Sequence, residues 1–282
     1  MMTIGIVGYG LIGGSVGMAL KENTSHHVIA IDSNPDVLNY VSGNNIADEV
    51  SDVNCTVLKK CDIIYIALYP DAIIDFVKEN SVFFKKGAIV VDLCGIEHYI
   101  SEKMSEVSNG DFYYVGAHPM AGKEKSGITA ACADLYSGAS FLITVNENTN
   151  NDAVETVKQL AKSMGFANII VTDDINHDRM ITYTSQLPHI MSVAYIMQDC
   201  HNKCFGYYAG SFKDMTRVAD INSALWTQLF KYNKELLTSQ IDEYIDALKK
   251  IRNAINSDGD ELNNLLFKSK HLKEWQDENY KY

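Results

Sequence analysis

A glycine-rich turn near the N-terminus has the residue types that bind a dinucleotide. The run Gly8-Tyr9-Gly10-Leu11-Ile12-Gly13 fits G-x-G-x-x-G and lies between a strand-like and a helix-like segment. Gly8 allows a tight turn, Gly10 lacks a Cβ that would block a pyrophosphate, and Gly13 lets helix and strand pack closely. The pyrophosphate would meet the free N–H groups that open the helix. A glycine-rich turn in some other α/β fold is the alternative.

Asp32 bears on the choice of cofactor. It ends the second strand-like segment about 20 positions after the turn. Its carboxylate would accept hydrogen bonds from the adenosine ribose and repel a 2′-phosphate, and residues 33–35 supply no Arg to neutralise one. We therefore expect NAD rather than NADP, with Leu68 and Tyr69 lining the adenosine side.

His118 is the residue best suited to acid–base chemistry. A base must take the hydroxyl proton when a nicotinamide cofactor oxidises an alcohol. His118 follows an apolar strand, Phe112 to Ala117, and leads into a turn with Pro and Gly, so it would point into the cofactor crevice. A histidine that merely caps the strand is the alternative. Polar surroundings instead predict surface positions for His26, His27, His98, His201 and His271.

The elements that must position these residues divide the chain in two. Up to Thr172, short apolar runs alternate with helical patterns, which predicts a Rossmann-type, doubly wound and mostly parallel sheet. The predicted strands are Thr3 to Gly8, His27 to Asp32, Asp62 to Leu68, Ala88 to Asp92, Phe112 to Ala117, Ser140 to Val145 and Asn168 to Thr172. Later periodicity predicts helices over Asp173 to Cys200, kinked or broken by Pro188, and over Ile221 to Asn256. We expect an α/β domain over 1–172 and an all-helical domain over 173–282.

The composition narrows the class of protein. The 282 residues include 36 acidic and 24 basic side chains, and the net charge of −12 disfavours nucleic acid or an anionic membrane as the main partner. There is neither an apolar stretch long enough to span a bilayer nor a secretory leader. The six cysteines form no C-x-x-C pair, and Cys200, His201 and Cys204 lack a second ligand pair, so no disulfide framework and no metal are expected. These features predict a cytoplasmic protein.

Four segments resemble the prephenate dehydrogenase family, which includes the arogenate dehydrogenases. They are Gly8 to Ser15 (GYGLIGGS), Gly116 to Gly127 (GAHPMAGKEKSG), Ser185 to His189 (SQLPH) and Gly210 to Ala219 (GSFKDMTRVA). The resemblance implies an oxidoreductase of tyrosine biosynthesis that converts prephenate and NAD to 4-hydroxyphenylpyruvate, CO2 and NADH. Arogenate dehydrogenase is the nearest alternative. A β-hydroxyacid dehydrogenase would need a catalytic lysine that we do not find, and a non-catalytic NAD-sensing protein is a further alternative.

The resemblance also implies roles for site residues. The family's catalytic histidine falls on His118, and its carboxylate-binding arginine falls on Arg217, whose guanidinium suits a bidentate grip. His189 matches the histidine that contacts the pyruvyl side chain of the substrate. Lys213 and Gly210 lie in the same matched segment as Arg217 and are expected on the substrate side.

Trp226 and His177 are weaker candidates. Trp226 matches a family aromatic, although a core position fits it equally well. His177 lies about 18 Å from His189 if the intervening helix is straight, so both could contact one substrate only if that helix breaks.

One segment departs from the family pattern. The family has Asp-x-Gly-Ser-x-Lys where this chain has Asp92-Leu93-Cys94-Gly95-Ile96-Glu97, so Gly95 stands at the serine position and Glu97 at the lysine position. A water or the Cys94 thiol would have to replace the hydrogen bond that the serine makes to the histidine.

The helical domain is expected to pair two subunits. Its apolar pattern is larger than a monomer usually leaves exposed. The active site would lie between the two predicted domains, with His118 on one wall and His189 and Arg217 on the other.

Overall fold

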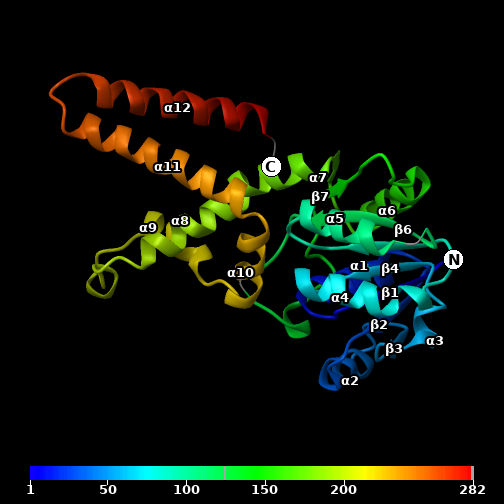
Figure 1. Ribbon diagram of the computed structural model, residues 1–282. Coiled ribbons are helices and arrows are strands. Elements are labelled where there is room, and N and C mark those ends of the chain that lie inside the picture. The colour runs from blue at the N-terminus through cyan, green and yellow to red at the C-terminus, as the bar shows by residue number, and fades with distance from the viewer. Residues whose placement is uncertain (109, 124, 281–282) are drawn as a thin grey trace. The chain divides into compact units, whose positions relative to one another are not determined.

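Eight strands form one sheet in the N-terminal part of the molecule (Figure 1). The computed structural model describes residues 1–108, 110–123 and 125–280. The sheet order is β3-β2-β1-β4-β5-β6-β7-β8, and only β6 and β7 pair antiparallel. The strands are β1 Thr3–Val7, β2 His27–Ile31, β3 Glu49–Ser51, β4 Ile63–Ile66, β5 Ala88–Asp92, β6 Phe112–Pro119, β7 Ser140–Thr144 and β8 Asn168–Thr172. The predicted doubly wound, mostly parallel sheet is confirmed.

Helices cover both faces of this sheet. Within β4, Ile63 and Tyr65 enter one hydrophobic cluster while Ile64 and Ile66 enter the other. Because alternate side chains of a strand point to opposite faces, a strand covered on both sides is apolar throughout. One cluster includes α1 Leu11–Asn23, α2 Pro35–Gly43 and α6 Asn151–Ser163; the other includes α3 Cys55–Leu58, α4 Pro70–Asn80 and α5 His98–Val107.

The sequence misjudged two strands. It missed β3, which has only three residues, all partly exposed, and therefore carries no apolar pattern. It also ended the sixth strand too early, because β6 continues through His118 and Pro119, which pair with Leu142 and Phe141 of β7. His118 is therefore held inside the ladder rather than in the turn after it.

The chain after β8 is helical. In the described part of this region there is no strand, as predicted. The helices are α7 Asp174–Ile181, α8 Leu187–Ile196, α9 Gly210–Thr216, α10 Ser223–Tyr232, α11 Lys234–Ile255 and α12 Glu261–Asn279. The predicted single helix over 221–256 is wrong, because Asn233 separates α10 from α11.

Pro188 interrupts the preceding helix as expected. Residues Thr182–Gln186 form a π-helical turn, η3, and Pro188 stands in the first turn of α8. A proline ring clashes with the carbonyl four residues earlier, and the wider turn removes that clash.

The chain forms two compact units. The first covers Met1–Lys234 and the second begins at Glu235. The predicted domain boundary at 172/173 lies inside the first unit and stays a prediction. Among the described residues, every helix is too short or too polar to cross a bilayer.

Candidate active site

The glycine turn between β1 and α1 lies where the strand order reverses, between β1 and β4. Ligands of open α/β sheets bind in the crevice at that position. Gly8 has φ +84°, and a Cβ built on it would lie 2.5 Å from the Ala67 carbonyl oxygen. A Cβ on Gly13 would overlap the Gly8 carbonyl oxygen, whereas one on Gly10 would meet nothing within 4 Å. Gly8 and Gly13 are therefore needed by the backbone of the turn itself. Gly10 instead leaves open space at the start of α1, and we call this space the cradle.

This cradle fits a dinucleotide. Gly10 caps α1 without a side-chain hydrogen bond, so the N–H groups at Leu11 and Ile12 face the cradle without a capping side chain. Asp32 stands just after β2 and accepts hydrogen bonds from the Tyr9 and Asn34 N–H groups at 2.8 Å each. The Leu68 side chain lies against Gly8. The predicted cofactor residues thus lie together, although their roles stay predictions.

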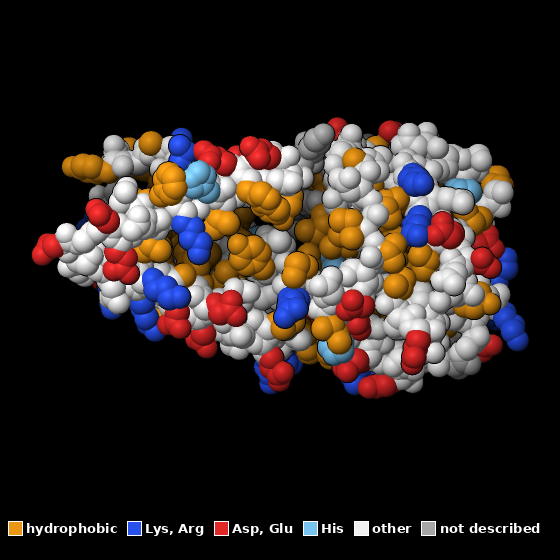
Figure 2. Space-filling model, turned by 90° about the horizontal axis from the view of Figure 1, so that it is seen from above, with side chains coloured by type: hydrophobic (Ala, Val, Ile, Leu, Met, Phe, Trp, Pro, Cys, Tyr) orange, Lys and Arg blue, Asp and Glu red, His pale blue; other side chains and the backbone are white. Residues whose placement is uncertain are grey.

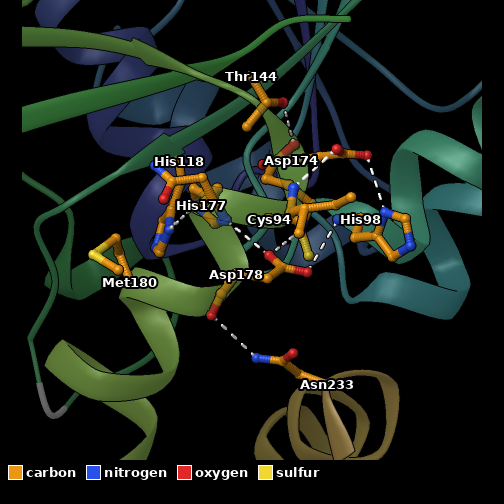
Figure 3. A network of polar contacts seen from close by, with 12 residues as sticks. Cys94, His98, His118, Thr144, Asp174, His177, Asp178, Met180 and Asn233 are labelled. Carbon is orange, nitrogen blue, oxygen red and sulfur yellow. Dashed lines mark hydrogen bonds and ion pairs between the residues drawn. The ribbon is translucent and has the colours of Figure 1, made fainter. Parts of the chain in front are cut away.

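His118 contacts a second histidine. Its Nδ1 lies 3.1 Å from Nε2 of His177, which α7 supplies (Figure 3). The Nδ1 of His177 lies 2.8 Å from Oδ1 of Asp178. Two imidazoles and a carboxyl group therefore form a continuous chain, and His177, a weaker candidate from the sequence, contacts His118 directly.

Asp178 is held firmly. Its oxygens accept hydrogen bonds from the backbone N–H groups of Glu97, at 2.8 Å, and His98, at 3.1 Å, where α5 begins. Its carbonyl oxygen accepts from the Thr182 hydroxyl, at 2.7 Å, and from the Asn233 amide (Figure 3). The start of α5 and His177 thus hold the carboxyl group of Asp178, while Thr182 and Asn233 hold its backbone carbonyl.

Buried carboxyl groups surround this chain. Glu97 is fully buried, and its Oε2 accepts a hydrogen bond from the Thr144 hydroxyl at 2.8 Å. Burial, and then the charge of Asp92, raise the pKa of Glu97 well above its ordinary value. Burial likewise raises the pKa of Asp92 to about 7, although Tyr114 donates a hydrogen bond to it. Glu97, at the position where the family resemblance implies a lysine, is therefore a carboxyl group that favours its neutral form.

The imidazole of His118 also favours its neutral form. Burial, and then the neighbouring His177, lower the pKa of His118 to about 3. A neutral imidazole can accept a proton, which a general base must do.

Gly95 leaves space beside His118. A Cβ built on Gly95 would lie 3.7 Å from Nε2 of His118 and 3.7 Å from the Leu229 side chain. Those are ordinary contact distances, so a serine would fit here. In the described residues no hydrogen bond joins the Cys94 thiol to His118, and burial raises the pKa of Cys94 well above its ordinary value. The thiol does not replace the serine.

The predicted substrate residues gather on the helices that follow. The His189 ring lies 4.0 Å from the Trp226 ring, centroid to centroid, and its Nδ1 donates to the Ser185 carbonyl oxygen. Arg217 is exposed in a short helix, η5 Arg217–Ala219, that packs against α8. Trp226 lies one helical turn from Leu229 on α10, so α10 connects His189 with the space beside His118.

Lys213 and Gly210 lie on α9, which packs against both α8 and η5. The Lys213 ammonium lies 5.9 Å from the Tyr208 ring centroid. Their substrate contacts stay predictions, as do those of His189 and Arg217. The described residues contain no cluster of three or more His, Cys, Asp or Glu side chains that could hold a metal ion.

The sequence could have given His177 and Asp178 more weight. Both are polar, yet they lie four and three residues before Ile181 and so share its face of the helix, which is buried. Buried polar residues on the inner face of a helix need partners, and this periodicity was the available signal.

Two family models together match most of the chain. The model described as "Prephenate dehydrogenase, nucleotide-binding domain" matches residues 16–171, and that described as "Prephenate dehydrogenase, dimerization domain" matches residues 173–268.

Individual relatives agree with these matches. A prephenate dehydrogenase of Bacillus subtilis (strain 168) is 27% identical over 282 residues, which are 98% of this chain and 75% of the relative. A cyclohexadienyl dehydrogenase of Zymomonas mobilis is 28% identical over 281 residues, which are 97% of this chain and 93% of the relative.

Solved structures show the same fold. A prephenate dehydrogenase from A. aeolicus, in complex with hydroxyphenyl propionate and NAD+, has a TM-score of 0.87 at 24% identity and covers 97% of each chain. An arogenate dehydrogenase of Synechocystis has a TM-score of 0.82 at 24% identity and covers 97% of this chain and 99% of that one.

Proposed function

This chain belongs to the prephenate dehydrogenase family of oxidoreductases, and from that premise we propose that it is an NAD-dependent prephenate dehydrogenase. It oxidises the ring hydroxyl of prephenate with loss of the ring carboxylate, and the products are 4-hydroxyphenylpyruvate, CO2 and NADH. The observation that carries this proposal is the placement of His118 in β6, with Nδ1 against His177 and Nε2 towards Gly95.

The cradle at the glycine turn holds the cofactor. Gly8, Gly10, Leu11, Ile12, Gly13, Asp32 and Leu68 are the residues assigned to it. NAD supplies the hydride acceptor when it is bound. The A. aeolicus relative, solved with NAD+, supports a cofactor of this class. Asp32 favours NAD over NADP because its carboxylate repels a 2′-phosphate.

His118 acts as the general base. Nε2 accepts the proton of the ring hydroxyl as the C–O bond gains double-bond character. The ring hydroxyl approaches Nε2 from the side of Gly95, where the family resemblance implies a serine. Loss of the ring carboxylate then makes the ring aromatic, which makes the reaction effectively irreversible.

Arg217 and His189 bind the anionic substrate. The protein carries a net charge of −12, so local cations must offset its repulsion of a dianion. Arg217 grips a carboxylate bidentately, and His189, whose ring lies against that of Trp226, contacts the pyruvyl side chain of the substrate. Lys213 and Gly210 complete this side of the site.

The functional form is a homodimer in the cytoplasm, built from a cofactor domain over 1–172 and a helical domain over 173–282. The dimerization-domain match supports pairing. Exposed apolar side chains in the helical part, such as Met197, Phe205, Leu266 and Phe267, support it as well. Figure 2 shows hydrophobic side chains at the surface among the charged ones.

A paired assay tests the function. Purified protein is incubated with NAD and either prephenate or arogenate, and NADH and CO2 are both measured. We expect equal amounts of the two products with prephenate and a smaller kcat/KM with arogenate. The same assay with NADP should give a lower kcat/KM.

Two results would contradict the proposal. Faster turnover of arogenate would assign the chain to arogenate dehydrogenase instead. NAD binding without NADH formation from either substrate would indicate a sensing protein.

A further inference from the structure

We infer that His177 and Asp178 position the base: they keep a proton on Nδ1 of His118 and so leave Nε2 free to act. The inference rests on the proposed function, since His118 must act as the base for its orientation to matter. His177 and Asp178 are positioning residues, because in this structure they reach the site only through His118.

The inferred arrangement of protons takes Asp178 as a carboxylate and His177 as a neutral imidazole. An ionised carboxyl group only accepts hydrogen bonds, so Nδ1 of His177 must donate to Asp178. Nε2 of a neutral His177 then carries the lone pair and accepts from Nδ1 of His118. This assignment of protons follows from the network.

The consequence falls on the other nitrogen of His118. A neutral imidazole has one protonated and one free nitrogen, so Nε2 of His118 is the free one. In the described residues no hydrogen bond is made to that atom, and it faces Gly95. The same atom is therefore basic and accessible to a substrate hydroxyl.

Burial makes this arrangement persistent. His177 is 1% exposed and Asp178 is 3% exposed, and two backbone N–H groups hold Asp178 in place. Neither side chain can turn without leaving a buried polar group unpaired, which is costly. Positive charge develops on His118 when it accepts a proton. The carboxyl group of Asp178, at the far end of the hydrogen-bond chain, stabilises that charge.

A purely structural role for the pair is the competing explanation. Asp178 accepts the first N–H groups of α5 and would stabilise that helix even if His118 did no chemistry. The experiment must therefore read the proton position directly.

The test compares three variants with one control. His177→Phe removes the acceptor for Nδ1 of His118, whereas His177→Gln can accept from His118 through its carbonyl oxygen and donate to Asp178 through its amide. Asp178→Asn removes the charge at the end of the chain but can keep an acceptor. His98→Gln is the matched control, because the His98 ring pairs with Asp174 and does not contact His118.

Four quantities are measured for each variant. They are the steady-state kcat and KM, the melting temperature, and the tautomer of His118 from NMR of ¹⁵N-histidine-labelled protein. The signal of His118 is assigned by its loss in His118→Asn.

The expected pattern is specific to positioning. His177→Phe should lower kcat about 100-fold or more, because misplacing the proton of a catalytic histidine is that costly. Its KM should change less than about threefold. His118 should shift towards the Nε2–H tautomer in His177→Phe and keep Nδ1–H in His177→Gln, which should regain about tenfold in kcat. Asp178→Asn should lower kcat about tenfold or more with the tautomer retained.

Other outcomes overturn the inference. An unchanged His118 tautomer in His177→Phe does so, as does a kcat within about threefold of the His98→Gln control. An unchanged kcat in Asp178→Asn would show that Asp178 does not help to position His118. If His177→Phe does not fold, His177→Leu, with a smaller side chain, is judged by the same criteria.

Failure of the proposed function would look different. Wild-type protein would then turn over neither substrate, whereas the tautomer measurement, which needs no activity, would still decide whether the pair fixes the proton on His118.

Discussion

The cofactor turn and the polar cluster around His118 both lie on the sheet, but they are built from different parts of the chain. At the turn, backbone atoms do the work: Gly8 adopts a positive φ, Gly13 touches a carbonyl oxygen, and α1 offers its N–H groups. At His118 the contacts come from side chains on β6, α7 and α10 and from the backbone at the start of α5.

The difference explains where this chain departs from its relatives. In the turn, backbone atoms leave no space for larger side chains, so the glycine spacing of the turn is retained. A cluster made of side chains can exchange one hydrogen-bonding group for another. Gly95 and Glu97, which replace the family's serine and lysine, both lie in the cluster.

The largest expected effect tests the centre of the cluster. His118→Asn should lower kcat by about 10²- to 10⁴-fold, because it removes the base. The dissociation constant for NAD should stay within about threefold, since the glycine turn is untouched. Steady-state kinetics and NAD titration measure the two, with His271→Asn on exposed α12 as the control. A parallel loss of NAD binding would show that the two regions are not separate.

The next prediction concerns the anion-binding side chain. Arg217→Ala should raise the KM for prephenate about 10- to 100-fold, because a hydrogen-bonded charge pair is lost, with a smaller change in kcat. Arg217→Lys should give an intermediate KM, since it keeps the charge but not the planar fork. Arg252→Ala on α11 is the control. A fall in kcat with constant KM would contradict the assigned role.

Two glycines of the turn should respond differently to the same substitution. Gly13→Ala should lower the stability of the free protein by about 1–3 kcal/mol, because the new methyl group meets the Gly8 carbonyl oxygen. Gly10→Ala should leave the melting temperature unchanged but weaken NAD binding, because its methyl group enters the open cradle. Equal losses of stability in both would mean that the cradle is part of the packed core.

The smallest effect is the pH dependence of stability. Between pH 4.5 and 6.5 the folded protein keeps protons on Asp92 and Glu97 that the unfolded chain has lost. It lacks the proton that His118 gains on unfolding. The protons retained by the two carboxyl groups make the folded state bind more protons in this range, so stability should fall as the pH rises.

Glu97→Gln isolates this effect. It removes one of the two retained protons, so stability should become nearly level across the same range. Urea unfolding at several pH values measures it, with Glu102→Gln on the exposed face of α5 as the control. An unchanged slope would show that Glu97 is ionised in the folded protein.

Local signals made the fold and the cofactor turn predictable. Continuous apolar runs identified seven strands, and in the central strands they arise because both faces of the sheet are covered, whereas the glycine spacing identified the turn. β3 was missed because three partly exposed residues carry no pattern. The break at Asn233 was missed because that side chain bonds Thr182 and Gln186, which are distant in sequence.

The cluster was predictable only in part. His118 could be identified because a strand pattern and a turn flank it. The role of His177 depends on a π-helical turn and on the path of α7 past β6, and residue spacing encodes neither. The same spacing argument that placed His177 far from His189 could not show that His177 lies beside His118.

Asp178 has a practical consequence for protein engineering. It accepts the first N–H groups of α5 from residues 81 and 80 positions earlier in the chain. A fragment that ends at residue 172 would lose that cap and the neighbour of His118 together. A chimera that joins the first part of one relative to the second part of another would pair Asp178 with the start of α5 from a different protein. The junction is therefore better placed after α7, so that α7 stays with the sheet.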